Sequence, residues 1–265
     1  MTDFPLDLAT QITSISDTRL KAEGGEAYWN FQSAFGGWAL ALGYSAVEQA
    51  RPQEAMLASV TANFLKPLPH EGLMVDVRQL RQGRRTSFLR AEMAKGDAFD
   101  EPIFAADYVF SDMKDKALDY ACEFPEVLVP EDAPRLPETP GPKFLSRYEQ
   151  RVALGKPFSA QERPHSAFWV RDAAGRPWDE KALLAVSDTP MPRTFFLDPT
   201  PRFGATVTYD LQVFCTRADL AEQGSDFLLI EATSDRVYSG RFSATTRIWS
   251  ASRKLLAISN QLAFY

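Results

Sequence analysis

The sequence predicts an α+β protein of two similar halves, each of them a curved antiparallel sheet wrapped around a central helix. Three observations lead to this prediction. The first half contains a helical run that is apolar on nearly every face, four strand-like segments follow it, and the second half repeats that order. A helix that is apolar all round must be buried on all sides, and the concave face of a curved sheet offers such a place.

A proline-rich segment divides the chain. With 265 residues, the chain is long for one domain and sufficient for two. The stretch from Phe124 to Pro142, FPEVLVPEDAPRLPETPGP, holds six prolines and little periodicity. Because proline has no backbone donor and blocks helices, this segment is typical of an extended linker, partly packed on the surface. We therefore predict an N-terminal domain at 1–122, a linker at 123–145 and a C-terminal domain at 146–265.

The first half supplies the central helix. Phe35, Gly36 and Gly37 lead into WALALGYSAVEQA, which reaches about Ala50 before Pro52 stops it. Short turn-like separators follow, and they divide the next sixty residues into strand candidates. These candidates run from Leu57 to Leu65, Leu73 to Leu80, Thr86 to Ala94 and Ile103 to Phe110.

The second half repeats this order after a leading strand at Ser166–Arg171. Asp179 is a candidate N-cap for a helix running through EKALLAVSD, and Pro190 and Pro192 stop it. The strand candidates that follow run from Ala205 to Phe214, Phe227 to Thr233, Phe242 to Trp249 and Leu255 to Phe264.

The repeat also extends to individual residues. ASVTANFL at Ala58 matches ATVTYDLQ at Ala205, which places Thr61 opposite Thr208. Further on, Phe88 matches Phe242 and Asp107 matches Gln261, and RADLAEQGSD accounts for the longer second half as a longer loop. Such internal duplication fixes the architecture before any single motif does.

Composition and charge limit the kinds of partner. The formal net charge of −6 argues against nucleic acid, whose phosphates need a basic surface. Arg81, Arg84 and Arg85 form one short basic cluster. It is either a solvated hairpin turn or a contact for the phosphates of a nucleotide-bearing substrate.

The sequence does not indicate a disulfide-rich, secreted or membrane-spanning protein. Two cysteines, Cys122 and Cys215, are too few for a disulfide framework. No basic and apolar leader opens the chain and no apolar run is long enough to span a membrane, so we expect no membrane association and a cytoplasmic location.

Known catalytic motifs are also missing. No G-x-S-x-G, Walker loop or G-x-G-x-x-G occurs, and His70 and His165 lack the neighbours of a zinc site or a catalytic triad. We expect no metal and no cofactor.

Four motifs carry a resemblance to a known family. SDTPMP at Ser187, ATVTYDLQVF at Ala205 and AISNQLAFY at Ala257 resemble motifs of the acyl-CoA thioesterase II family and its thioesterase-like relatives, and FGGWALALGYSAV at Phe35 resembles the helix motif of their first domain. The resemblance covers nearly the whole chain in order and spacing. It implies a tandem, or double, hotdog fold and hydrolysis of an acyl-CoA substrate.

The resemblance also implies site residues. In that family an Asp, a Thr and a Gln hold and activate the hydrolytic water, and they match Asp188, Thr208 and Gln261 here. Thr206 remains an alternative to Thr208, because a slip of one or two residues is easily made. The sequence departs from many relatives at Leu211 and Gln212, where they carry histidine and serine.

These residue types suit thioester hydrolysis. A carboxylate accepts the water's proton, while a hydroxyl and a carboxamide orient that water. Gly36 and Gly37, at the start of the buried helix, offer backbone N–H groups for the carbonyl oxygen. Each residue also has a purely structural interpretation. Asp188 fits the end of a helix or the start of a turn, Thr208 an ordinary strand position, and Gln261 a bond to neighbouring backbone. Gly36 and Gly37 fit a tight entry into the helix.

Alternatives remain open at this stage. One is a hotdog hydratase or dehydratase, which usually relies on a histidine beside the aspartate. The other is a non-catalytic binding protein for acyl-CoA or another apolar ligand, which the departures at Leu211 and Gln212 keep open. Asn63 and Asp107 occupy the corresponding places in the first half and are interpreted as remnants or structural polar groups, so we expect one active site per chain. Hotdog sheets often pair further, so a homodimer is a possible assembly.

Overall fold

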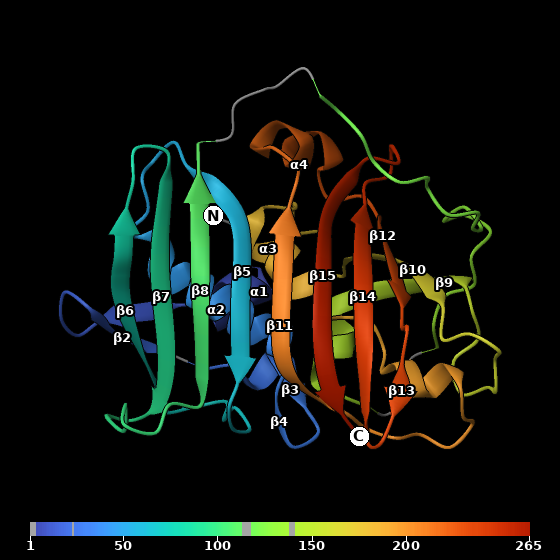
Figure 1. The fold of residues 1–265 in the computed structure, drawn as a ribbon, viewed down its shortest axis with the longest axis horizontal. Coiled ribbons are helices and arrows are strands. Elements are labelled where there is room, and N and C mark those ends of the chain that lie inside the picture. The colour runs from blue at the N-terminus through green and yellow to red at the C-terminus, as the bar shows by residue number, and fades with distance from the viewer. Residues whose placement is uncertain (1–3, 23, 113–117, 138–140) are drawn as a thin grey trace.

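One large antiparallel sheet organises the molecule. The computed structural model describes residues 4–22, 24–112, 118–137 and 141–265, and within them a 13-stranded sheet has the order β1-β2-β6-β7-β8-β5-β11-β15-β14-β12-β10-β9, with β13 paired to β14. Figure 1 shows helices α1, α2 and α3 on one face of this sheet. A separate two-stranded hairpin, β3–β4, leads into α2.

The N-terminal half contributes the first part of the sheet. Its elements are α1 (Pro5–Ala9), β1 (Ile12–Ser14), β2 (Arg19–Ala22), η1 (Glu26–Tyr28), β3 (Trp29–Asn30), β4 (Ser33–Ala34), α2 (Gly36–Glu48), β5 (Met56–Phe64), β6 (Leu73–Gln82), β7 (Thr86–Lys95) and β8 (Phe104–Ser111).

The C-terminal half contributes the rest. Its elements are η2 (Lys143–Arg147), β9 (Tyr148–Leu154), β10 (Ser166–Asp172), α3 (Glu180–Val186), η3 (Arg193–Phe196), β11 (Ala205–Val213), α4 (Arg217–Gln223), β12 (Leu228–Thr233), β13 (Val237–Tyr238), β14 (Arg241–Trp249) and β15 (Leu255–Phe264).

The two halves follow the same plan. Starting from the central pair β5 and β11, the strands run outward as β5-β8-β7-β6-β2-β1 in one half and β11-β15-β14-β12-β10-β9 in the other. Strands β5 and β11 pair antiparallel, with Asp210 opposite Thr61. The duplicated order predicted from the sequence is therefore present in the sheet, and the seam between the halves is continuous.

Helix α2 is buried as its composition predicts. Every residue from Gly37 to Val47 is buried, and the helix packs against β6, β7, β8 and α3. The indole N–H of Trp38 donates to the carbonyl of Ala9 at 2.8 Å, which satisfies the one polar atom of that buried side chain. The largest hydrophobic cluster, around α2 and α3, includes residues from both halves.

The described part of the predicted linker lies against the C-terminal half. Residues 118–137 contain no helix or regular strand, while 138–140 lie outside the described residues. The Phe124 ring contacts Trp249 edge-on at 5.4 Å between centroids and Trp169 at 6.4 Å. The segment thereby covers a second apolar cluster on the face of the sheet opposite the helices.

Three predictions about elements were wrong or incomplete. The RADLAEQGSD segment is not a loop but contains α4, which a capping box of Thr216 and Asp219 begins. Strands β1 and β2, which were not predicted, extend the sheet beyond β6. The register that matched Asp107 with Gln261 fails, because Asp107 lies opposite exposed Thr61 and pairs with Arg90, away from α2.

No helix in the described ranges is both long and apolar enough to cross a membrane.

Candidate active site

Asp188 lies where two helices of different halves meet. It follows the C-terminus of α3, and its partly buried side chain faces the N-terminus of α2. The Gly37 N–H donates to its carboxylate. A Cβ atom at Gly36 would lie only 2.6 Å from Asp188 Oδ2, so the carboxylate approaches the α2 backbone more closely than a side chain at that position would permit.

This environment shifts the titration of Asp188. Burial disfavours the charged form and raises the pKa to about 7, while the hydrogen bond from Gly37 acts in the opposite direction. The positive end of the α2 dipole also favours the anion. The result is a carboxyl group that changes charge near neutral pH, which suits a general base.

The backbone N–H groups of the two glycines have different surroundings. We expected Gly36 and Gly37 both to offer free N–H groups, but the Gly37 N–H is used by Asp188. Gly36 is the first helical residue, and within the described structure its N–H has no recorded partner. Gly37 also packs on the Ala185 carbonyl of α3, so a side chain there would collide with backbone.

The hydroxyl that accompanies Gln261 belongs to Thr206. Thr206 Oγ1 donates to Gln261 Oε1 at 2.8 Å, and this bond leaves the amide hydrogens of Gln261 available to another acceptor. Thr208, the residue expected here, is exposed on the other face of the sheet. The cause is an irregularity at Val207, where the β11–β15 register shifts between Thr206 and Thr208.

Tyr209 connects this pair with the segment that carries Asp188. Tyr209 lies opposite Gln261 in the β11–β15 register, is buried, and donates its hydroxyl to Ser187 Oγ at 2.6 Å, directly before Asp188. On the other side of the seam, the Phe64 ring lies 3.1 Å from the position of a Cβ at Gly36. Asp188 and the Thr206–Gln261 pair therefore lie in one region at the β5–β11 junction.

Sequence reasoning missed Tyr209 and Phe64. Both alternate with exposed neighbours in their strands, Thr208 and Asn63, and this alternation marks their side chains as facing the helices. The contact of Tyr209 with Ser187 joins segments 22 residues apart, which no local pattern indicates.

Beyond Asp188 the chain borders a cavity of about 10 Å³, which has room for about one water molecule. Pro190 and Met191 form one wall, and the inner face of the C-terminal sheet forms the other. The opposite wall consists of Gln150, Ser166, Phe168, Val170 and Ile230.

A buried arginine holds this loop in place. Arg193 is 1% exposed, and it donates to the carbonyls of Met191 and Ala232 and to Ser166 Oγ. Burial lowers its pKa to about 9. No carboxylate pairs with it among the described residues, so backbone carbonyls and the Ser166 hydroxyl accept its hydrogen bonds.

The remaining sequence candidates lie elsewhere. His70 packs edge-on against Trp29, and His165 bonds Glu231 at 3.0 Å, so neither histidine contacts Asp188. Arg81, Arg84 and Arg85 are exposed at the β6–β7 hairpin, at the end of the sheet opposite to the start of β11 (Figure 1). Among the described residues, no group of His, Cys, Asp or Glu side chains could hold a metal ion.

A large antiparallel sheet with few helices and a buried central helix is the architecture of a hotdog protein, an α+β class. The chain belongs to the acyl-CoA thioesterase family. Residues 26–111 match the acyl-CoA thioesterase N-terminal domain, and residues 130–265 match its C-terminal domain.

Solved structures agree with this assignment. A hot dog fold protein of unknown function from Alicyclobacillus acidocaldarius is 25% identical and has a TM-score of 0.92, with 99% of this chain and 98% of that chain covered. A protein assigned as a thioesterase II from Thermobifida fusca is 19% identical, with a TM-score of 0.85 and coverages of 100% and 98%.

A more distant neighbour is the acyl-CoA thioesterase II TesB2 from Mycobacterium marinum, at 14% identity, a TM-score of 0.76 and coverages of 98% and 97%. These last two likenesses concern the fold alone. Among curated proteins, no match is found. The family and its neighbours point to a thioester hydrolase.

Proposed function

We propose that this protein hydrolyses an acyl-CoA thioester to a free acid and CoA, with water as the nucleophile. The observation that carries the proposal is the carboxyl of Asp188, with a pKa of about 7, at the N-terminus of α2 and in the same region as the Thr206–Gln261 pair. A base that titrates near neutral pH beside a fixed hydroxyl–carboxamide pair suits the activation of water.

Each residue has a role in the proposed mechanism. Water, oriented by Thr206 and Gln261, attacks the thioester carbonyl carbon while Asp188 accepts its proton. The carbonyl oxygen becomes an oxyanion, for which the Gly36 N–H is the available backbone donor. Collapse of this tetrahedral intermediate breaks the C–S bond, and the proton on Asp188 passes to the departing CoA sulfur.

The arrangement of the halves is part of the same proposal. We assign one hotdog unit to each half, joined through β5 and β11 into a double hotdog. Because Asp188, Thr206 and Gln261 all come from the C-terminal half while Gly36 and Phe64 come from the N-terminal half, one such site forms per chain. The partner is an acyl-CoA, and pairing of two chains through their sheets is a compatible assembly.

Purified protein should release thiol from acyl-CoAs of graded chain length, detected with a thiol reagent. Asp188→Ala and Gln261→Ala should abolish or strongly reduce the release, whereas Thr208→Ala, on the exposed face, should leave it near the wild-type rate. Full activity of the Asp188→Ala variant would rule out the proposed base.

Two further measurements separate the other functions considered. Hydration of crotonyl-CoA without thiol release would indicate a hydratase, although neither histidine contacts Asp188. Calorimetric binding of acyl-CoA without turnover would indicate a binding protein.

A further inference from the structure

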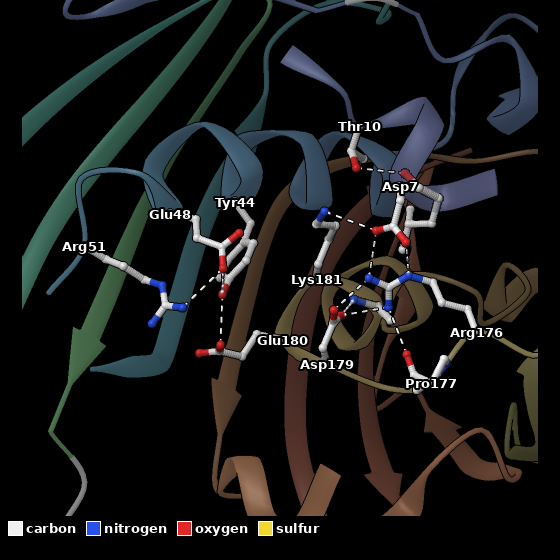
Figure 2. Close-up of polar contacts among 12 residues, drawn as sticks. Asp7, Thr10, Tyr44, Glu48, Arg51, Arg176, Pro177, Asp179, Glu180 and Lys181 are labelled. Atoms are coloured by element: carbon white, nitrogen blue, oxygen red, sulfur yellow. Dashed lines mark hydrogen bonds and ion pairs between the residues drawn. The ribbon is translucent and has the colours of Figure 1, made fainter. Parts of the chain in front are cut away.

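Glu180, at the start of α3, lies at the seam between the two halves and far along the helix from Asp188. Its side chain is 6% exposed and accepts hydrogen bonds from two groups of the N-terminal half. The Leu57 N–H donates to Oε1 at 2.5 Å, and the Tyr44 hydroxyl donates to Oε2 at 2.9 Å. Figure 2 shows Tyr44 pointing from α2 toward Glu180.

The Leu57 N–H needs this partner because of local strand geometry. The β5–β8 register shifts between Leu57 and Ser59, and the pairing of β5 with β11 begins only at Ser59. Leu57 thus lies beyond the β5–β11 ladder, and its buried N–H would be costly without an acceptor. A carboxylate from the other half supplies that acceptor.

Charges around Glu180 come from both halves. Arg217 of α4 lies 3.6 Å from Glu180 Oε2 and also donates to the Ala55 carbonyl just before β5. Glu48 is 3.3 Å from the Tyr44 hydroxyl and pairs with Arg51. The shorter bond of Tyr44 is the one to Glu180, so the single hydroxyl hydrogen is directed across the seam.

The two contacts lie at opposite ends of one helix pair. Helices α2 and α3 pack against each other, with Gly37 beside Asp188 at one end and Tyr44 beside Glu180 at the other. At 1.5 Å per residue, Gly37 and Tyr44 are about 11 Å apart along α2. Contacts at both ends of the helix pair restrict the sliding and the rotation of α3 against α2.

We propose that Glu180 is a positioning residue, which locks α3 to the N-terminal half so that Asp188 meets the N-terminus of α2. It does not touch the reacting atoms. Its effect on hydrolysis rests on the proposed function, whereas its effect on the geometry does not.

The test compares Glu180→Ala, Glu180→Gln and Asp179→Ala. Glutamine keeps an acceptor for Leu57 and a polar partner for Tyr44, so it should retain most of the activity. Asp179 caps the same helix by accepting the Ala182 N–H at 2.8 Å and pairs with Arg176, but it makes no recorded contact with Tyr44 or Leu57 (Figure 2). Asp179→Ala is therefore the control for a merely destabilised α3.

Glu180→Ala should lower kcat by about 10- to 100-fold with little change in KM, because the base is displaced rather than the binding surface. Its acid-side midpoint in the pH profile of kcat/KM should move upward, since the Gly37 bond that favours the charged Asp188 is weakened. Asp179→Ala should lower thermal stability and leave that midpoint in place.

Amide hydrogen exchange at Gly37 gives a readout that needs no turnover. Glu180→Ala should speed exchange at Gly37, at the far end of the helix pair, and Asp179→Ala should not. If the wild type hydrolyses no thioester but Glu180→Ala still speeds amide exchange at Gly37, the proposed hydrolase function is wrong and the positioning role of Glu180 is supported. Unchanged Gly37 exchange in Glu180→Ala, or equal effects in the two alanine variants, would overturn the proposal.

Discussion

At the scale of single residues, the charge state of Asp188 governs the expected pH dependence. Its pKa of about 7 means that kcat/KM should fall on the acid side with a midpoint near that value, because the protonated carboxyl cannot accept a proton from water. Asp188→Asn, which keeps the shape and an acceptor for Gly37, should reduce kcat by about 10²–10⁴-fold. Initial rates at several acyl-CoA concentrations, from pH 5 to pH 9, give both kcat and kcat/KM, and the absence of a fall in kcat/KM between pH 8 and pH 5 would contradict the assignment.

The same carboxyl should make folding depend on pH. Its pKa is about 7 in the folded protein and ordinary, near 3.9, in the unfolded chain, so the stabilisation of the neutral form is complete below about pH 4 and lost as pH rises through about 7. Relative to wild type, Asp188→Asn should thus gain roughly 1–3 kcal/mol between pH 5 and pH 8. Urea unfolding at the two pH values tests this, and an unchanged difference would exclude a strongly raised pKa.

The threonine of the candidate site was predicted wrongly because of a backbone irregularity in β11. Asp188 and Gln261 were predicted from their motifs, and Thr208 was preferred over Thr206 because the motif was aligned through Thr208, Tyr209 and Asp210. In a regular strand the two threonines would share a face, but the register shift at Val207 puts them on opposite faces, and such a shift leaves no mark in composition. Asp107 was misassigned for the same reason, since its face depends on the register of β8 and not on its residue type.

At the scale of elements, the closest approach of α2 and α3 depends on a residue without a side chain. A Cβ at Gly37 would collide with the Ala185 carbonyl, which belongs to backbone and cannot rotate away. Gly37→Ala should therefore destabilise the fold by about 1–3 kcal/mol and lower activity, because Asp188 moves with α3.

The matched control on the same helix is Ser45→Ala. Ser45 Oγ is buried without a hydrogen-bond partner in the described structure, so its removal should change stability by less than about 1 kcal/mol or increase it slightly. Thermal unfolding of both variants measures the contrast. Equal stability of Gly37→Ala and wild type would show that the helices separate without cost.

Elements with strong local signals were predicted, and those fixed by distant contacts were not. The all-apolar composition of 36–48 and the proline stops gave α2 and α3 close to their observed bounds. In α4 the signal existed but was overlooked, since Thr216 and Asp219 stand in capping-box spacing. Strands β1 and β9 lie at the two edges of the sheet, and their short pairings depend on neighbours that sequence alone does not place.

At the scale of the whole molecule, the shared seam predicts one cooperative unfolding transition despite two similar halves. The β5–β11 ladder, the α2–α3 contact and Glu180 all cross that seam, and the main core includes side chains of both halves. Calorimetry should give a single peak whose calorimetric and van't Hoff enthalpies agree. The fragment 146–265 alone should not fold, because it would expose the β11 edge and the apolar side of α3.

A variant away from the seam serves as the comparison. Phe124→Ala removes the ring that packs on Trp169 and Trp249, so it should lower the melting temperature and yet preserve the single transition. Two resolved transitions in the wild-type protein, or a fragment 146–265 with native-like amide protection, would mean that each half folds by itself. In that case the tie between Asp188 and the N-terminus of α2 would form only after the halves dock, and activity would be lost before either half unfolds.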